Sequence, residues 1–208
     1  MLRDVALIAA EDTRRTRVLL ARYGIETPVT SYFEHNKLRR GPALIERLRS
    51  GQSVALVTDA GTPGISDPGF HLVRLARETG VPVVPVPGPS AVIAALSVAG
   101  VPGDRFVFEG FLPVKRGRRL ARLRELEALG RPVVLYESPH RLAATLESLA
   151  EVFGPAEVVL GRELTKQFEE VRRGTAAELL GAVRAEGVRG ELTLVINPRR
   201  APERLDHR

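Results

Sequence analysis

The chain has 208 residues, of which 44% are hydrophobic and 27% are charged, enough to bury a core as one large or two small domains. No run approaches the roughly 20 apolar residues of a membrane span, and the first twenty residues are too charged for a signal peptide, which predicts a soluble, cytoplasmic protein. The absence of cysteine and the scatter of the four histidines predict that there is no metal site. The net charge of +6 favours a polyanionic partner, although an arginine-rich composition alone also produces an excess of positive charge.

The first half of the chain alternates short apolar runs with segments of helical period, which is the pattern of an α/β protein. Strands are predicted at residues 5–10, 28–33, 53–58 and 81–86. Helices are predicted at residues 13–23, around 42–48, at 70–79 and at 90–100. Asp12 stands where it can cap the first of these helices, and Pro42 suits the first turn of the second.

The alternation pauses near residues 105–115, where Pro113 precedes a basic segment, and this pause predicts a domain boundary. The second half then gives strands at 132–137, 156–164, 169–175 and 190–197, with helices through Leu142 to Phe153 and at 176–186. We therefore expect two α/β domains, residues 1–109 and 110–198, followed by a flexible tail at 199–208.

The stretch TDAGTPGISDPG, residues 58–69, follows the strongest predicted strand and holds three glycines and two prolines. Open α/β sheets bind ligands at the carboxyl ends of their strands, and glycine lets a ligand lie directly on backbone groups. A long turn with Asp67 as a helix cap is the alternative interpretation. A second loop, VPGPS at residues 86–90, ends the next predicted strand and offers the N–H groups of Ser90 and Ala91 at a helix start.

Six segments together resemble one family: LIAAEDTRRTRVLL, ALVTDAGTPGISDPGFHLVR, VVPVPGPSAVIAALSVAG, FVFEGFLP, YESPHR and GRELTKQFEE. In this order they are similar to the ribosomal RNA small subunit methyltransferase I family, which has the tetrapyrrole methylase fold. The resemblance implies two α/β domains with a cofactor cleft between them. It also implies transfer of a methyl group from S-adenosylmethionine to a ribose 2′-oxygen of a cytidine in small-subunit (16S) ribosomal RNA, by a homodimer.

The resemblance also implies which residues contact the cofactor, because the family's motifs match particular positions of this sequence. From the two glycine- and proline-rich loops they are Gly61, Thr62, Pro63, Ile65, Ser90 and Ala91. From the second half they are Tyr136, the segment from Leu160 to Glu163 with Arg162, and Thr193.

The sequence departs from the family's usual pattern at both ends. Members begin with a strand that ends in a Thr-Pro-Ile-Gly-Asn loop, whereas Met1 here stands just before the motif that follows that loop. We expect that the natural start lies upstream, because loss of an inner strand would expose two sheet edges. Many members also extend further beyond the final strand.

A ribose 2′-hydroxyl is weakly acidic, so a base near the methyl donor would assist the transfer. The residues do not choose among four candidates, which are Asp59, Glu109, Glu137 and Lys166. Two of these could have a structural role instead of a catalytic one. Asp59 can cap its turn, and Glu137 can pair with Arg141 four residues later. His140 is a further possible base, but its position at the start of a helix, after Pro139, explains it equally well.

Basic residues at strand ends and in one helix are the candidates for contact with RNA. They are Arg14, Arg15, Lys37, Lys115, Arg118, Arg119 and Arg141. Residues 115–124, KRGRRLARLR, form the densest basic segment, although a solvated helix face has the same appearance. A small-molecule methylase of the same fold and a non-catalytic RNA-binding protein are the alternative functions. The first would favour Gly-Asp-Pro where this chain has Gly61-Thr62-Pro63.

Overall fold

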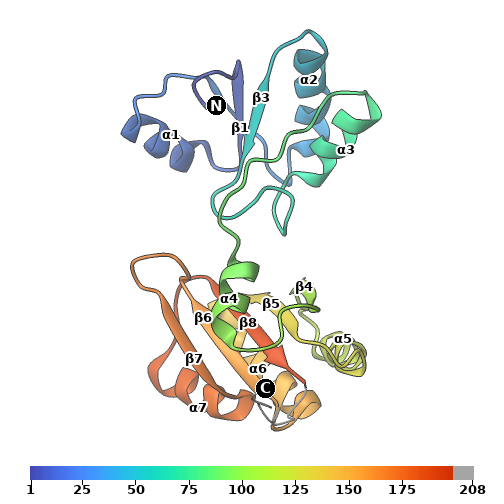
Figure 1. Ribbon diagram of the computed structural model, residues 1–208, viewed down its shortest axis with the longest axis vertical. Helices are drawn as coiled ribbons and strands as arrows, with labels where there is room; N and C mark the ends of the chain where they lie inside the picture. The colour runs from blue at the N-terminus through green and yellow to red at the C-terminus, as the bar shows by residue number, and fades with distance from the viewer. Residues whose placement is uncertain (199–208) are drawn as a thin grey trace, which may run out of the picture. The chain divides into compact units, whose positions relative to one another are not determined.

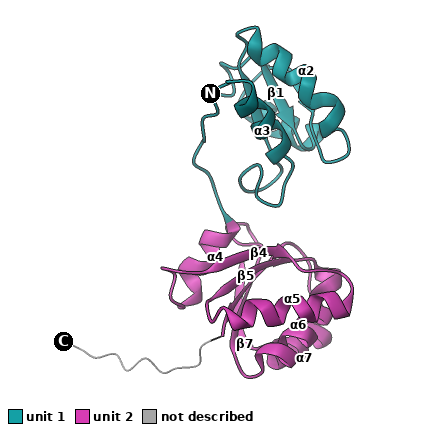
Figure 2. Ribbon diagram, turned by 90° about the vertical axis from the view of Figure 1, so that its right-hand side faces the viewer, with its two compact units in different colours: residues 1–90 teal, residues 91–208 magenta. Residues whose placement is uncertain are grey.

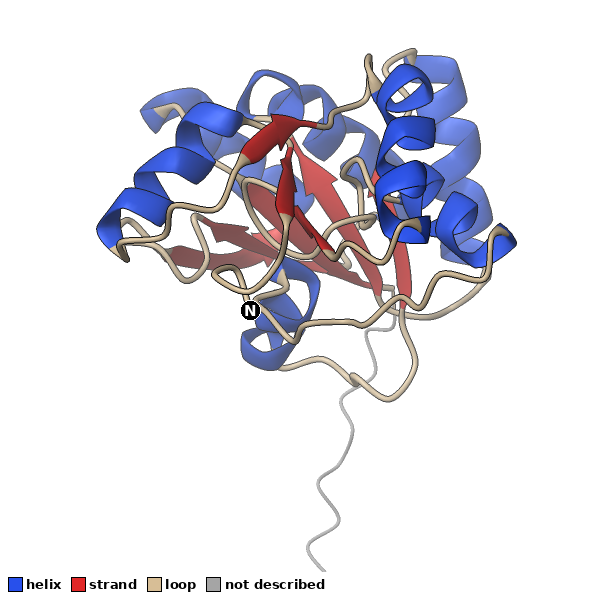
Figure 3. Cartoon of the chain, turned by 90° about the horizontal axis from the view of Figure 1, so that it is seen from above, coloured by secondary structure: helices blue, strands red, loops and turns tan. Residues whose placement is uncertain are grey.

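The structure is a computed structural model that describes residues 1–198 and divides into two compact units, Met1–Ser90 and one that begins at Ala91. Figure 2 colours the two units separately, and Figure 3 shows the helices and strands of the chain. The predicted flexible tail at 199–208 lies outside the described residues.

The first unit is a small parallel sheet with helices around it (Figure 1). Its elements are β1 (Leu7–Ala10), α1 (Thr13–Arg22), β2 (Val29–Ser31), α2 (Lys37–Arg49), β3 (Val54–Val57) and α3 (Phe70–Glu78). The strand order is β2-β1-β3, so β1 is central. The four residues of β1 are buried, as expected for a parallel strand covered on both faces.

The two faces of β1 bury different side chains because successive residues of a strand alternate. Leu7 and Ala9 pack with Leu44 and Ile45 of α2 and with Leu72 of α3 in one apolar cluster. This placement confirms the predicted α/β alternation. The helix α2, however, begins at Lys37, so Pro42 lies inside it and not in its first turn.

The predicted strand at 81–86 is wrong, since residues 81–90 form no regular structure. The sequence VPVVPV has the apolar, β-branched character of a strand, but β3 pairs with β1 alone. Pro82 and Pro85 lack the N–H groups that a ladder requires, and Val83 and Val84 are 46% and 73% exposed. Apolar content without a pairing partner therefore leaves an irregular segment.

The second unit is a five-stranded mixed sheet with helices on both faces. Its elements are α4 (Ala91–Ala99), β4 (Val107–Phe111), α5 (Arg116–Ala128), β5 (Val133–Glu137), α6 (Pro139–Phe153), β6 (Glu157–Arg162), β7 (Glu170–Thr175), α7 (Ala176–Glu186) and β8 (Leu192–Asn197). The strand order is β4-β5-β8-β6-β7, with β4 and β5 parallel and the other pairs antiparallel. The division after Ser90 is earlier than the boundary expected at 109/110, which falls inside β4.

Two apolar clusters cover the two faces of this sheet. The larger joins β5, β6 and β8 to α5, α6 and α7, with Leu142, Leu146 and Leu149 of α6 fully buried. The smaller joins α4 to the opposite face through Val92, Ala95 and Ala99. Figure 2 shows α5, α6 and α7 side by side, away from α4. The period of the apolar residues predicts α6 correctly, and α7 spans the predicted residues 176–186.

Candidate active site

The loop at residues 58–69 follows β3 at the carboxyl end of the parallel sheet, as predicted. Gly61 and Gly64 have φ angles of 77° and 87°, a left-handed conformation that favours glycine. Gly69 is required for a different reason, because a Cβ there would lie 2.7 Å from the nitrogen of Gly64. The loop thus closes tightly on its own backbone.

The first part of this loop presents backbone groups to solvent. Its internal hydrogen bond runs from the N–H of Ile65 to the carbonyl oxygen of Thr62, over 3.3 Å. Within the part of the chain that the structure describes, the N–H groups of Ala60, Gly61 and Thr62 donate no hydrogen bond. All three residues are exposed, so these donors are available to a ligand.

Glu11, which is not among the residues predicted for the site, fixes the start of the loop. Its Oε2 accepts a hydrogen bond from the hydroxyl of Thr58 at 2.6 Å and one from the N–H of Asp59 at 3.3 Å. Glu11 follows β1, and its own N–H donates to the carbonyl of Val57. Because β1 and β3 are parallel neighbours, the residue after β1 lies beside the residue after β3. The sequence carries no signal for this contact, since the pairing of the two strands is seen only in the structure.

Asp59 stands between charges of both signs. Its Oδ2 lies 3.2 Å from Nη1 of Arg15, and its side chain is 23% exposed. Burial raises the pKa of the Asp59 carboxyl; Arg15 opposes this shift, and the negative charges of Glu11 and Asp12 reinforce it. The carboxyl is therefore easier to protonate than that of an exposed aspartate.

The second loop lies beside the first within the first unit. A Cβ on Gly61 would lie 4.0 Å from the carbonyl oxygen of Pro89. Ser90 ends this unit and is half-buried, while Ala91 begins α4 in the second unit. The first unit therefore brings both predicted backbone-rich loops together.

In the second unit, the predicted contacts Tyr136 and Thr193 share one face of the sheet. They are direct partners across β5 and β8, and Gly161 of β6 continues the row beyond Thr193. Tyr136 also contacts two phenylalanines, with ring centroids 5.0 Å from Phe108 and 5.9 Å from Phe111. The result is a row of small and aromatic side chains on the α4 side of the sheet.

A β-bulge creates this aromatic group. Residues three apart on a regular strand point to opposite faces, yet Phe108 and Phe111 both contact Tyr136. The register of β4 against β5 shifts between Phe108 and Gly110, and Gly110 has a φ of 74°. The extra residue, Glu109, restores a common face to the two phenylalanines.

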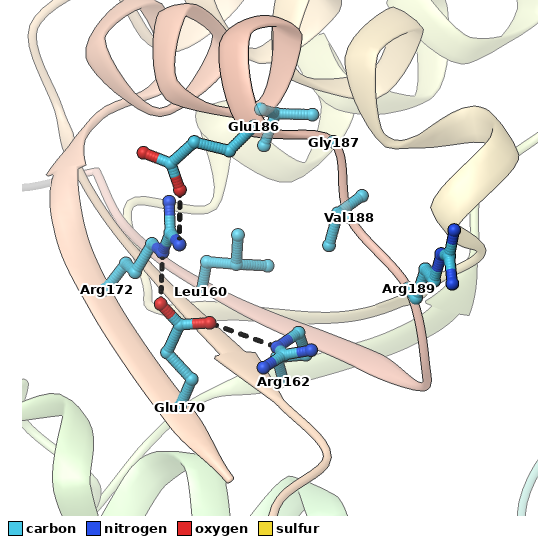
Figure 4. A pocket seen from close by; sticks show the side chains of 9 residues that line it. Leu160, Arg162, Glu170, Arg172, Glu186, Gly187, Val188 and Arg189 are labelled. Carbon is cyan, nitrogen blue, oxygen red and sulfur yellow. Dashed lines mark hydrogen bonds and ion pairs between the residues drawn. The ribbon is translucent and has the colours of Figure 1, made fainter. Parts of the chain in front are cut away.

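Arg162 lies on the other face of the sheet, away from Tyr136 and Thr193. It pairs in register with Leu192, which belongs to the larger apolar cluster. Its side chain lines a pocket of about 470 Å³ beside α7 (Figure 4). There Glu170 bridges Nε of Arg162 at 3.0 Å and Nε of Arg172 at 2.5 Å, so these charges are mutually compensated.

The candidate bases Glu109 and Lys166 of the second unit are held in structural contacts. Glu109 accepts two 2.7 Å hydrogen bonds from Arg122. Lys166 lies between Glu163 and Glu191, at 3.2 and 2.9 Å.

Glu137, the third candidate of this unit, is only 3% exposed and holds the start of α6. Its carboxylate accepts hydrogen bonds from the N–H of Ser138 and from the hydroxyl of Thr145, and it lies 3.4 Å from Nε of Arg141. Arg141 itself donates to the carbonyl of Leu112, so both residues have structural roles.

Several predicted RNA contacts are also occupied within the protein. Arg14 pairs with Asp12, the N-cap of α1, and Lys37 pairs with Glu34. The hydrogen bond with Arg14 lowers the pKa of Asp12 to about 2.

The basic segment at residues 115–124 is also partly occupied by contacts within the protein. Arg119 is only 6% exposed and donates to Ser148 and to the carbonyl of Val114. Lys115 and Arg118 are exposed, and neither forms an ion pair with another described residue.

Within residues 1–198, no cluster of three or more histidine, aspartate or glutamate side chains is arranged to hold a metal ion. Across the same residues, no helix has the length and apolar character needed to cross a membrane.

Comparison with known proteins gives consistent results for the chain. It is 50% identical to "Ribosomal RNA small subunit methyltransferase I" of Pseudomonas aeruginosa over 98% of its own length and 73% of that protein. It is 48% identical to the protein of the same name from Escherichia coli O157:H7, over 98% of this chain and 72% of the other.

A solved structure of uroporphyrin-III C-methyltransferase from Thermus thermophilus, complexed with S-adenosylhomocysteine, is similar in fold. Its TM-score is 0.62 at 17% identity, covering 93% of this chain and 86% of that one. The model of the family Tetrapyrrole (Corrin/Porphyrin) Methylases matches residues 1–180. The chain therefore belongs to the tetrapyrrole methylase family.

Proposed function

We propose that this protein transfers a methyl group from S-adenosylmethionine to the 2′-oxygen of a cytidine ribose in small-subunit ribosomal RNA. The observation that carries the proposal is the identity of about half of all aligned residues with relatives named ribosomal RNA small subunit methyltransferase I. From an RNA substrate of this kind we infer a cytoplasmic location. The family resemblance further suggests a homodimer, which light scattering on the purified protein tests.

The residues of the first loop suit the cofactor. Unpaired N–H groups from Ala60 to Thr62 are available to its polar groups, and the glycines leave no side chain in the way. S-adenosylmethionine, when bound, supplies an electrophilic methyl group on a sulfonium. The contacts we propose from the first loop are Gly61, Thr62, Pro63 and Ile65, with Ser90 and Ala91 from the second.

From the second unit, Tyr136 and Thr193 remain proposed cofactor contacts. They lie together on the α4 face of the sheet, where the aromatic rings of Phe108 and Phe111 provide further apolar surface. We leave Arg162 out of the proposed site because its side chain lines the pocket beside α7.

Asp59 is the proposed proton acceptor. Among the four candidates it retains an accessible carboxylate beside the proposed cofactor loop, and its raised pKa makes it a better base than an ordinary aspartate. The loop would hold the reacting groups in line and exclude water, which supplies much of the rate enhancement in a displacement of this kind.

The Asp59→Asn variant tests this role. We expect kcat to fall about 100-fold or more, as for removal of a general base, with a nearly unchanged Kd for S-adenosylmethionine. Equal loss of cofactor affinity would instead assign Asp59 to binding.

The decisive experiment for the proposed function is methyl transfer to isolated small ribosomal subunits and to naked ribosomal RNA. Labelled S-adenosylmethionine and mass spectrometry of the nucleosides identify the product. We expect 2′-O-methylcytidine. A methylated base, or methylation of a tetrapyrrole with none of RNA, would overturn the proposal.

A further inference from the structure

Three strands of the second unit end at the same edge of the sheet. The strands β4 and β5 are parallel, and β6 has the same direction because both β5 and β6 run antiparallel to β8. The ends of these strands carry Phe111, Tyr136 and the loop at residues 163–169, which connects β6 to β7 (Figure 1). Groups at the ends of these three strands therefore lie at one edge of the sheet.

The loop at residues 163–169 is held in one conformation by its own carboxylates. The side chain of Glu163 accepts from the N–H of Glu191 at 2.7 Å and lies 3.2 Å from the ammonium of Lys166. The side chain of Glu169 accepts from the N–H of Thr165. Backbone bonds join Lys166 to Glu163 and Glu169 to Lys166, at 2.9 and 3.2 Å.

The backbone of this loop is also strained. Glu163 and Thr165 have φ angles of 48° and 66°, and a β-branched residue such as threonine rarely adopts this region. Gly190 makes room for the arrangement, since a Cβ there would lie 2.7 Å from the Glu163 side chain. Strain of this kind persists where the surrounding contacts hold it, and it concentrates at functional sites.

The rigid loop exposes an aromatic ring. Phe168 is 64% exposed, although its neighbour Leu164 packs in the smaller apolar cluster together with Tyr136. Leu164 folds back over Gly161, where a Cβ would lie 2.9 Å from its Cδ1. The exposed ring is therefore carried on a loop whose Leu164 is anchored in the cluster that contains Tyr136.

We propose that Phe168 is a stacking platform for an unpaired base of the substrate RNA. Aromatic side chains on rigid supports stack on bases that have left the helix, and a 2′-hydroxyl is reached most easily in such a nucleotide. Glu163 and Glu191 pair with Lys166, and Glu169 accepts from the N–H of Thr165, so the charged groups of this loop are occupied and the ring offers RNA an uncharged contact with the face of a base. This inference rests on the proposed function.

Tryptophan fluorescence tests the proposal directly, because the chain contains no tryptophan. Phe168→Trp introduces a single tryptophan, which can be excited selectively over the three tyrosines and keeps an aromatic ring at the position. The matched control is Leu129→Trp, at a residue 54% exposed at the end of α5. The probes are a single-stranded ribosomal RNA fragment, its fully paired duplex, and S-adenosylmethionine alone.

In the Phe168→Trp variant, we expect single-stranded RNA to quench the emission, the duplex to quench it weakly, and the cofactor alone to leave it unchanged. The emission of the Leu129→Trp variant should respond to none of the three. Phe168→Ala should weaken binding of single-stranded RNA by about tenfold or more, which is the usual effect of removing one stacked base. Because the contact is uncharged, this factor should be the same at low and high salt.

Quenching of the Phe168→Trp variant by S-adenosylmethionine alone would overturn the proposal and assign the ring to the cofactor. Unchanged emission of the same variant when it binds RNA normally would also overturn it, while leaving the proposed function intact. Failure of the wild-type protein to bind or methylate ribosomal RNA would overturn both. Circular dichroism of Phe168→Ala verifies that the variant is folded.

Discussion

Gly69 matters at the scale of single atoms, because its missing Cβ lets the loop at 58–69 close. Gly69→Ala would place a methyl group 2.7 Å from the nitrogen of Gly64. A steric conflict of this size costs about 1 to 3 kcal/mol. We therefore expect affinity for S-adenosylmethionine, measured by calorimetry, to fall about tenfold. Gly103→Ala is the matched control, since a Cβ at Gly103 meets nothing within 4 Å.

Glu11 should influence the cofactor through the loop that it holds. Glu11→Ala removes the acceptor for Thr58 and Asp59, and loss of hydrogen bonds to a charged group should raise the Kd for S-adenosylmethionine about tenfold. Glu11→Gln keeps one acceptor oxygen and should restore most of the affinity. Equal affinity for the wild type and the alanine variant would show that the loop needs no such support.

Sequence is most informative for residues whose role depends on backbone geometry. The glycines of the loop at 58–69 are expected to permit positive φ angles, and Gly61 and Gly64 adopt them. Sequence is less informative for charged side chains, since it does not reveal which partner a charge will find. Arg119 and Glu137 resemble functional groups, yet both are buried in hydrogen bonds that connect different elements of the second unit.

At the scale of elements, α7 begins with a capping box that should stabilise the second unit. Thr175 accepts from the N–H of Glu178 at 3.3 Å, and the Glu178 side chain accepts from the N–H of Thr175 at 2.7 Å. Thr175→Ala should reduce the free energy of unfolding by about 1 kcal/mol. Urea denaturation measures this change, and Thr175→Ser should lose much less.

The loop at 163–169 should loosen in acid. The hydrogen bond from the N–H of Glu191 holds the pKa of the Glu163 carboxyl below its ordinary value of 4.5, and Lys166 adds to the effect. A lowered pKa stabilises the folded loop above pH 4.5, and this contribution is lost as the pH falls through the folded value. Hydrogen exchange of residues 163–169 should accelerate in that window, and Glu163→Gln should lack the transition.

Strand prediction works where apolar residues find partners, and it fails where partners are lacking. The apolar runs of β1, β3, β5 and β8 predict these strands. The segment 81–86 has a similar composition but no pairing strand, and the bulge at Glu109 depends on a register that only the neighbouring β5 defines. Pairing is a property of two segments, so one-dimensional patterns predict it incompletely.

At the scale of the whole molecule, the charge of +6 should make RNA binding depend on salt. Removal of one phosphate contact reduces the slope of log affinity against log salt by about 1. Arg118→Ala should show this reduction because Arg118 is exposed and forms no ion pair with another described residue. Arg119→Ala should lower the melting temperature instead and leave the salt slope unchanged.

The central position of β1 has a consequence for tolerance to change in chain length. Both neighbours take their alignment from this strand, and Glu11 and Asp12 follow it immediately. Insertion of one residue between Leu7 and Ala10 would exchange the buried sets of its two faces and displace the carboxylate that holds Thr58. Insertions in the turn after α1, near Gly24, would change neither the buried faces of β1 nor the position of the Glu11 carboxylate. Related chains should therefore vary in length at that turn and keep the spacing from Leu7 to Asp12 constant.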